Sequence, residues 1–182
     1  MTIRSGVVED AAAIADVHIR SWRAAYRGIV PDDALASLND ERLTRIWADR
    51  LIGEFTGPGA GVLVAEREGA VVAFAGFAPA DDPEAPEGTE RRVVDLGTFY
   101  SVPEVWGSGV NRGLAEAVHS AMTRGPFGEA VLWVLSANSR ARRFYESRGW
   151  QDTGVEIEEG LLGGTITRPV SLYRRSIGPL PG

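Results

Sequence analysis

The middle of the chain alternates between strand-like and helix-like patterns. Residues 91–102 (RRVVDLGTFYSV) are rich in β-branched and aromatic residues and predict a strand, which Pro103 ends. A glycine-rich turn follows, and residues 109–124 have the apolar spacing of a helix. Residues 129–136 (EAVLWVLS) predict a strand that is buried on both faces. The segment from Asn138 (NSRARRFYESR) predicts another helix, so the pattern favours a sheet with helices packed on it.

The flanking segments extend this pattern. They predict a strand at 2–5, helices at 10–27, 31–38 and 40–53, strands at 61–68 and 70–79, and closing strands at 150–157 and 165–175. The acidic, proline-rich stretch 81–90 predicts a mobile loop, and Pro169 predicts an edge position or a bulge in the last strand. No repeat or linker divides the chain. We therefore expect one domain over residues 1–182, an α/β or α+β fold with a mixed sheet.

Composition excludes several kinds of chemistry. The chain has no Cys, which removes disulfides, thiolate zinc sites and Cys nucleophiles. All 19 basic residues are Arg, so a phosphate-loop lysine and a lysine Schiff base are excluded as well. With only two His, we expect no metal site. The net charge of −6 disfavours nucleic acid and suits an amine-bearing small molecule, although an ordinary protein surface explains the charge equally well.

The sequence predicts no association with a membrane. No window approaches the roughly 18 apolar residues that a membrane-spanning helix needs. The opening residues MTIRSGVVEDAA lack the apolar core of a signal peptide. We therefore expect a cytoplasmic protein.

A glycine-rich turn lies where a strand is followed by a helix, within PEVWGSGVNRGLAEAV (103–118). Gly107, Gly109 and Gly113 leave successive backbone N–H groups exposed beside the positive end of the helix dipole. Such a turn binds an anion without any basic side chain. A simple strand-to-helix turn explains the glycines equally well. A dinucleotide fingerprint fits less well, because it would need glycine where Arg112 stands.

The segment NSRARRFYESRGW (138–150) reads as a short capped helix. Asn138 is a good N-cap and Gly149 a natural stop. One face is defined by the i, i+3, i+4, i+7 spacing of Ala141, Phe144, Tyr145 and Arg148. We expect Phe144 in the core and Tyr145 at the edge of this face, where its hydroxyl needs a partner. The alternative is that both rings are merely core.

Taken together, WGSGVNRGL and LWVLSANSRARRFYESRGW resemble motifs of the GNAT superfamily of acetyl-CoA-dependent N-acyltransferases. The opening stretch IRSGVVEDAAAIADVHIRSWRAAYRGIVPDDAL resembles the first strand and helices of that family, and the likeness spans Ile3 to Tyr173. It implies a mixed, mostly antiparallel sheet of about seven strands flanked by helices. A central parallel pair, here 91–102 and 129–136, would be splayed to admit pantetheine. Acetyl-CoA would be the acyl donor.

The resemblance also implies which residues hold the cofactor. The turn that binds the pyrophosphate of coenzyme A corresponds here to Gly107, Ser108, Gly109, Val110, Asn111, Arg112 and Gly113. The preceding strand end, Tyr100, Ser101 and Val102, would meet pantetheine through backbone groups, and Asn138 would lie near the pantetheine arm. Two positions depart from the family pattern. Trp106 replaces the usual Gln or Arg, and Asn111 replaces a small residue.

For catalysis, Tyr145 matches the family tyrosine that can protonate the leaving thiolate. A phenol has a pKa of about 10 and is therefore neutral and able to donate at pH 7. We expect the N–H of Val102 to polarise the thioester carbonyl. Asp95 is the candidate base, acting through water. A simple ion pair of Asp95 with Arg91 or Arg92 explains that carboxylate equally well.

The predicted reaction is direct attack of an amine, from a small molecule or a peptide, on acetyl-CoA in a ternary complex. Trp22 and Tyr26, near the end of the first long helix, are the candidate acceptor-binding residues. The alternative function is a catalytically silent acyl-CoA-binding module, which the departures from the family pattern at Trp106 and Asn111 favour. A serine hydrolase built on Ser108 and His119 is set aside, because the G-x-S-x-G elbow is missing. A homodimer is one option for the oligomeric state.

Overall fold

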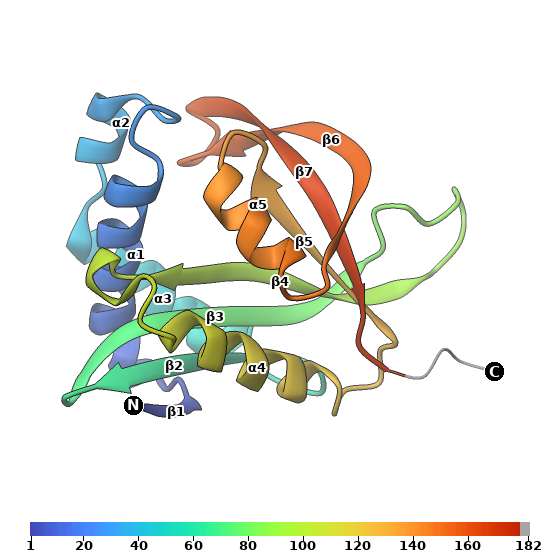
Figure 1. Cartoon of the computed structure of the whole chain (residues 1–182), viewed down its shortest axis with the longest axis horizontal. Helices are drawn as coiled ribbons and strands as arrows, with labels where there is room; N and C mark the ends of the chain where they lie inside the picture. Colours follow the sequence, from blue (N-terminus) through green and yellow to red (C-terminus); the bar gives the residue numbers. More distant parts are fainter. Residues whose placement is uncertain (179–182) are drawn as a thin grey trace.

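Seven strands form one sheet in the computed structural model, which describes residues 1–178 (Figure 1). They are β1 (Thr2–Ser5), β2 (Gly61–Arg67), β3 (Ala70–Asp81), β4 (Arg92–Ser101), β5 (Glu129–Leu135), β6 (Gln151–Leu161) and β7 (Ile166–Ser176). Their order across the sheet is β1-β2-β3-β4-β5-β7-β6. Only β4 and β5 pair in parallel, and the other neighbours are antiparallel. The predicted mixed, mostly antiparallel sheet is confirmed.

Within residues 1–178, five α-helices lie between the strands along the chain. They are α1 (Ala11–Ala25), α2 (Asp32–Ala36), α3 (Asp40–Gly53), α4 (Val110–Met122) and α5 (Ser139–Glu146), with short 3₁₀ turns at Val8–Asp10 and Pro103–Val105. The predicted local signals flank α5: the side chain of Asn138 accepts a hydrogen bond from the Ala141 N–H at 3.1 Å, and Gly149 has a φ of 81°. Helix α1, predicted over 10–27, ends earlier, at Ala25. Within residues 1–178, no helix is long and apolar enough to span a bilayer.

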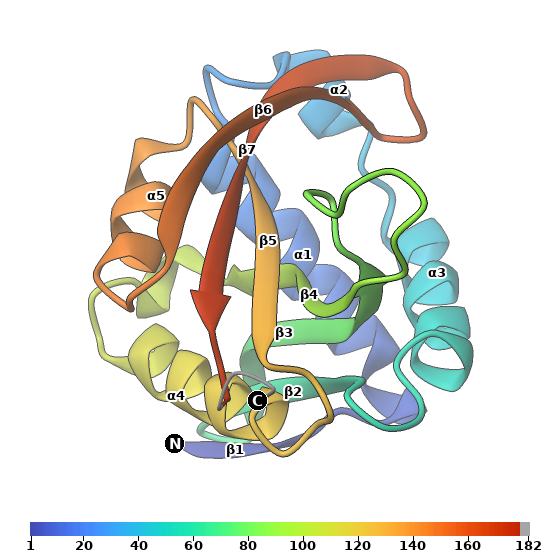
Figure 2. The same ribbon diagram turned by 90° about the vertical axis from the view of Figure 1, so that its right-hand side faces the viewer.

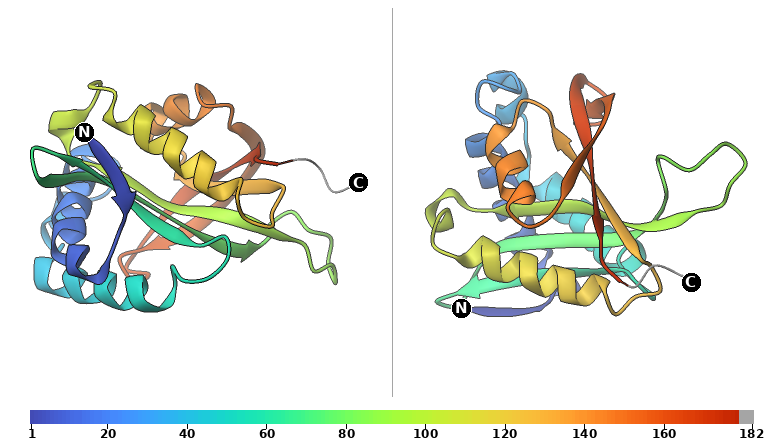
Figure 3. Two further views of the ribbon diagram at one scale, coloured as in Figure 1. Left: turned by 90° about the horizontal axis from the view of Figure 1, so that it is seen from below. Right: turned by 45° about the vertical axis from the view of Figure 1, so that its right-hand side comes forward.

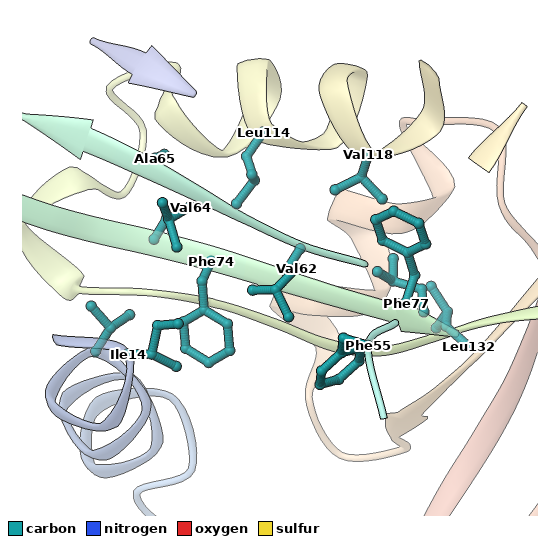
Figure 4. Close-up of a cluster of buried hydrophobic side chains, with 14 of the residues drawn as sticks. Ile14, Phe55, Val62, Val64, Ala65, Phe74, Phe77, Leu114, Val118 and Leu132 are labelled. Atoms are coloured by element: carbon teal, nitrogen blue, oxygen red, sulfur yellow. The ribbon is translucent and has the colours of Figure 1, made fainter. Parts of the chain in front are cut away.

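Helices cover both faces of the sheet. Helices α1 and α3 pack on one face, and α4 packs on the other (Figure 3). Leu114 and Val118 of α4 are buried against β2 and β3, as Figure 4 shows. Ile14 of α1 and Phe74 of β3 fill the opposite side and are fully buried. The main core therefore lies on the N-terminal half of the sheet and holds β4 in place.

A bulge interrupts the pairing of β3 with β4. Between two paired rows, β3 contributes one residue, Phe77, whereas β4 contributes two, Leu96 and Gly97. Beside it, the hydroxyl of Thr98 accepts a hydrogen bond from the Gly76 N–H at 3.0 Å. A bulge bends its strand and changes the face to which the following side chains point. Gly97 was the sequence signal for this bulge, which the strand prediction did not include.

The parallel strands β4 and β5 part soon after they meet. They pair only at Val94–Ala130 and Asp95–Val131, although both strands continue beyond these rows. The prediction that these two strands are parallel neighbours that splay at their carboxyl ends is confirmed.

The prediction for Pro169 is wrong. Strand β7 lies between β5 and β6, not at an edge, and the pairing of β6 with β7 is regular at this residue. The carbonyl of Pro169 accepts from the Ser136 N–H at 3.0 Å, one residue beyond the end of β5. In an antiparallel pair the N–H and C=O of one residue face the same neighbouring strand. The N–H that Pro169 lacks would therefore point toward β5 at a level where the pairing with β5 has already ended.

The β6–β7 hairpin arches over the end of α1 (Figure 2). Leu161 and Ile166 at its tip pack with a small core around Trp22. Arg168 of β7 donates a hydrogen bond to the carbonyl of Ile29, between α1 and α2, at 2.8 Å. The hairpin therefore forms a wall on the α1 side of the sheet, opposite α4.

Candidate active site

A cavity of about 590 Å³ follows the gap between β4 and β5. Its walls come from α1, β4, β5, α5, the turn before α4 and the β6–β7 hairpin, so it opens toward both faces of the sheet. The predicted site residues that line it are Trp22, Tyr26, Asp95, Tyr100, Ser101, Gly107, Gly109, Asn111, Arg112, Asn138 and Tyr145. The structure therefore brings residues from distant parts of the chain together. The predicted residues outside its lining are Val102, Ser108, Val110 and Gly113.

The turn before α4 has the geometry of an anion site. Gly107 and Gly109 have φ values of 78° and 92°, a left-handed conformation that favours glycine. The N–H groups of Val110, Asn111 and Arg112 open the helix and donate no hydrogen bond within residues 1–178. Free amides at the positive end of a helix dipole bind anions such as phosphates.

Ser108 is held by its own turn. Its hydroxyl donates to the carbonyl of Val105 at 2.6 Å, and its N–H donates to the same oxygen at 3.2 Å. His119 lies near the other end of α4, about 15 Å further along a helix of this rise. The two side chains form no dyad, so the structure gives no support to a serine hydrolase.

Gly113 serves packing. Its N–H already donates to the carbonyl of Gly109 at 3.1 Å, and a Cβ at this position would lie 2.8 Å from the side chain of Met1. The side chain of Val110 is buried in the main core, which leaves only its backbone N–H for a ligand. These glycine and valine positions hold α4 close to the sheet.

Trp106 ties the turn to the end of β4. Its indole N–H donates to both the carbonyl and the hydroxyl of Ser101, at 3.2 and 3.0 Å. The guanidinium of Arg140 stacks on the same indole, with its central carbon 3.4 Å from the ring centre. Arg140 and Arg112 thus place two positive charges in the cavity lining beside the free amides. Sequence reasoning missed Arg140, because only the tertiary structure brings the start of α5 to this turn.

The two aromatic rings of α5 do not take the predicted places, with Phe144 in the core and Tyr145 at its edge. Phe144 is half-buried, lines the cavity and lies 5.5 Å from the ring of Phe99, so its assignment to the core is wrong. Tyr145 packs against the main core and contacts Trp150 edge-on at 6.2 Å. Burial raises the pKa of the Tyr145 phenol above its ordinary value, so the hydroxyl stays protonated at neutral pH.

An aromatic cluster lines the α1 side of the cavity. Trp22 of α1 and Tyr26, just after its end, have ring centres 4.9 Å apart, and the ring of Tyr100 stacks on that of His18 at 4.8 Å. Burial lowers the pKa of His18 to about 4, and its Nδ1 accepts a hydrogen bond from the indole of Trp47, so this histidine is neutral. Burial also raises the pKa values of Tyr26 and Tyr100. The cluster therefore carries no charge at neutral pH.

Asp95 is a half-buried carboxylate at the start of the gap. Burial raises its pKa to about 6, the charge of Glu54 adds to this effect, and Arg50 opposes it. Its Oδ1 is buried and has no hydrogen-bond partner within residues 1–178. A carboxyl with a pKa near neutrality in a cavity is a candidate acid–base group.

The alternative pairing of Asp95 is wrong. Arg91 forms its ion pair with Asp82, and Arg92 approaches Asp81 at 3.3 Å. Asp82 is also bound by Arg174 of β7, and these hydrogen bonds outweigh the effect of burial and hold the pKa of Asp82 at about 2. Arg91 and Arg92 are thus engaged by acids just after β3 and at its last residue.

The role predicted for the backbone of Val102 is also wrong. Its N–H donates to the carbonyl of Val72 on β3 at 2.9 Å. Because residues of an antiparallel strand alternate between partners, the N–H groups of Phe99 and Ser101 point away from β3, toward the gap. These two amides, and not that of Val102, face the gap.

The chain belongs to the acetyltransferase (GNAT) family, whose family model matches residues 18–150. It is 31% identical over 172 residues to the uncharacterized N-acetyltransferase YuaI of Bacillus subtilis, covering 90% of this chain and 92% of that protein. It is 29% identical to an uncharacterized N-acetyltransferase of Mycobacterium tuberculosis, over 80% of this chain and 86% of that protein. The protein is therefore an acyltransferase.

Solved structures share its fold. PaiA N-acetyltransferase from Thermoplasma acidophilum, in complex with coenzyme A, superposes with a TM-score of 0.72 at 18% identity, over 96% of this chain and 98% of that one. The structure of yncA from Salmonella typhimurium with its cofactor acetyl-CoA gives a TM-score of 0.69 at 22% identity, over 100% and 96% of the two chains. The predicted fold is confirmed.

The ionisation of Asp95 makes the stability of the protein depend on pH. The free side chain has a pKa of 3.8, and the folded protein raises it to about 6. Below both values the carboxyl is protonated in the folded and the unfolded state. Between them the unfolded chain loses its proton first, so stability falls as pH rises. Above about pH 6 the ionised Asp95 lowers the free energy of unfolding by a nearly constant amount of about 3 kcal/mol.

The Asp95→Asn variant has no carboxyl proton to lose, so its stability is expected to lack the fall with rising pH that Asp95 causes. Urea unfolding of both proteins from about pH 4 to about pH 8 measures the difference in their free energies of unfolding. A difference that stays constant across this range would show that Asp95 is not perturbed.

Proposed function

We propose that the protein transfers an acetyl group from acetyl-CoA to a primary amine of a small molecule or peptide, by direct attack in a ternary complex. The observation that carries this proposal is the gap between β4 and β5, which leads from the free amides of α4 to the aromatic cluster on α1. A ligand with phosphates at one end and a reactive group at the other fits such a path.

The splayed strands offer hydrogen bonds to an extended ligand. Alternation along the strands directs the main-chain groups of Phe99 on β4 and Trp133 on β5 into the gap. Buried backbone groups without partners are costly, so a ligand that brings amides is favoured there. The pantetheine arm contains two amide groups. The pyrophosphate would then lie on the N–H groups of Val110, Asn111 and Arg112, beside Arg140.

The departure at Trp106 does not argue against a cofactor. Its indole holds the turn on Ser101 and supports Arg140, so the position still supplies a positive charge, now through the neighbouring helix. The case for a catalytically silent module is thereby weakened. Release of free coenzyme A from acetyl-CoA in the presence of amines distinguishes the two functions.

In the reaction, the amine nitrogen attacks the thioester carbonyl and forms a C–N bond. The C–S bond then breaks, the nitrogen loses a proton, and the sulfur leaves as a thiolate. The N–H groups of Phe99 and Ser101 are candidates to stabilise the carbonyl oxygen. Because the chain has no Cys, we propose no thioester on the enzyme.

Tyr145 is proposed to act on the leaving thiolate mainly as a hydrogen-bond donor. A free thiol has a pKa of about 8.5, which lies below that of the buried phenol, so complete proton transfer from Tyr145 is uphill. A hydrogen bond still stabilises the negative sulfur as charge develops. The thiolate then leaves without needing to become a neutral thiol.

Asp95 is proposed as the base that receives the proton of the amine, through water. Deprotonation of the amine alone makes log kcat/KM rise with pH at a slope of one. Below about pH 6, deprotonation of Asp95 is also required, so the slope there is expected to be two. Asp95→Asn is expected to keep a slope of one throughout. Glu54→Gln removes a charge that raises the pKa of Asp95 and should move the break to lower pH. An unchanged break in the Asn variant would exclude Asp95.

Gly109→Glu tests the phosphate site. The variant places a carboxylate beside the free amides, and the repulsion should weaken acetyl-CoA binding at least about tenfold in calorimetry. Gly88→Glu is the matched control: both glycines have positive φ and open space around their Cβ positions, but Gly88 does not line the cavity. Equal affinities in the two variants would contradict the assignment.

Tyr145→Phe tests the donor role. Loss of a hydrogen bond to a charged group costs about 1.5–3 kcal/mol, so kcat should fall by about tenfold to a hundredfold with KM for acetyl-CoA unchanged. Tyr173→Phe is the control, because its buried hydroxyl binds Arg142 and Glu146 outside the cavity lining. That variant should lose stability and keep kcat. A Tyr145→Phe enzyme with full kcat would reduce Tyr145 to a packing residue.

A further inference from the structure

A second, much smaller cavity adjoins Tyr145. Its volume of about 10 Å³ is close to the minimum that holds one water molecule. Phe99, Phe144 and Tyr145 line both this cavity and the large one, and the far side of the small cavity comes from α4 and β7. An occupant would therefore be a single atom or one very small molecule.

Three basic side chains line the small cavity, and each comes from a different part of the fold. His119 lies on α4, Arg148 lies two residues after the end of α5, and Arg175 lies on β7. A Cβ on Gly149 would be 3.8 Å from the Nε of Arg175, so the chain just after Arg148 passes close to this arginine. Burial lowers the pKa of His119, and the charge of Arg175 lowers it further. The three side chains therefore share one junction, where α4, the end of α5 and β7 meet.

Two nitrogen atoms at this junction are buried without a partner. They are Nδ1 of His119 and Nε of Arg148, and neither has a hydrogen-bond partner within residues 1–178. The Nε–H of an arginine is always a donor, and a neutral imidazole can carry its proton on Nδ1 and donate as well. Burying a donor without an acceptor is costly. The junction therefore needs an acceptor atom that the described residues do not supply.

The acidic side chains of the neighbouring segments are engaged elsewhere or exposed. Glu146 accepts a hydrogen bond from the hydroxyl of Tyr173 at 2.9 Å, and Asp152 pairs with Arg142 at 2.9 Å. Glu116 of α4 is exposed. Among the residues that the structure describes, no acidic side chain lines the small cavity, and neither arginine of the junction forms an ion pair.

Arg174 provides a comparison within the same strand. It precedes Arg175 on β7, so its side chain points to the opposite face of the sheet. There it pairs with three carboxylates, those of Asp82, Glu84 and Glu129. A half-buried positive charge is stabilised by a nearby negative charge, and the described part of the chain offers none to the junction. The junction therefore favours an anion.

We propose that this junction binds one monatomic anion, chloride, between His119, Arg148 and Arg175. An anion accepts hydrogen bonds and donates none, which matches a site made of donors. It also offsets the repulsion between the two guanidinium charges. A water molecule would satisfy the two buried nitrogens but would leave the positive charge uncompensated. The ion ties the end of α5, which carries Tyr145, to α4 and β7, and its binding does not depend on the proposed acetyl transfer.

Thermal unfolding tests chloride binding in solution. The protein is unfolded in sodium chloride and in sodium gluconate of equal ionic strength, because gluconate is too large for the small cavity. A site with a Kd tenfold below the chloride concentration raises Tm by about 3–6 °C in a domain of this size. We expect a gain of this order in the wild-type protein relative to Arg148→Gln, which lacks one charge and the buried Nε–H. The comparison with the variant removes the general effect of each salt.

Arg143→Gln is the matched control. Arg143 is exposed on the same helix and lines neither cavity, so its variant loses an equal charge and should keep the wild-type response to chloride. Arg175→Gln should lose the response, and it replaces Arg148→Gln if that variant does not fold. Equal responses of the wild-type protein and of all these variants overturn the proposal.

Bromide locates the ion directly. It binds where chloride binds and scatters X-rays anomalously, so crystals grown in sodium bromide should show an anomalous peak within contact of Nδ1 of His119 and Nε of Arg148. Absence of a peak at the junction overturns the proposal and leaves a water molecule as the partner of these atoms. A peak without the chloride-specific gain in Tm means an adventitious ion only, and it overturns the proposal as well.

Discussion

The parting of β4 and β5 is the constraint on which the rest of the site depends. The strands pair at Asp95–Val131 and then diverge, which leaves main-chain groups of Phe99 and Trp133 without strand partners inside the protein. The bulge at Leu96–Gly97 bends β4 at this level. Unpaired backbone groups destabilise the fold, and the core between α1, α4 and the N-terminal strands offsets this, because it holds β4 in place without β5. A ligand with its own amides then completes the broken ladder.

Around this gap, burial rather than ion pairing sets the ionisation of the candidate groups. It raises the pKa of Asp95 to about 6 and lowers that of His18 to about 4, and it raises the pKa of Tyr145. A carboxyl that titrates near neutrality thus lies in the same cavity as a phenol that stays protonated. The ion-paired carboxylates, such as Asp82, lie outside that cavity lining.

Local signals made much of the fold predictable from sequence. The cap at Asn138, the stop at Gly149 and the turn at Gly109 each depend on a few neighbouring residues, and all three have the expected geometry. The errors depend on partners far along the chain. The N–H of Val102 is bound by β3, and Pro169 lies in an interior strand, which only the register and the strand order determine.

The change in charge of the acceptor also gives a direction to the proposed reaction cycle. The free acceptor carries an ammonium in solution, and acetylation leaves a neutral amide, so the product carries one positive charge fewer than the free acceptor. Its attraction to the ionised Asp95 falls accordingly, whereas coenzyme A would keep its phosphates on the α4 turn beside Arg140. The acetylated product is therefore expected to leave first, through the end bounded by α1 and the hairpin. Coenzyme A would follow through the opposite end, so the two products need not pass each other in the gap.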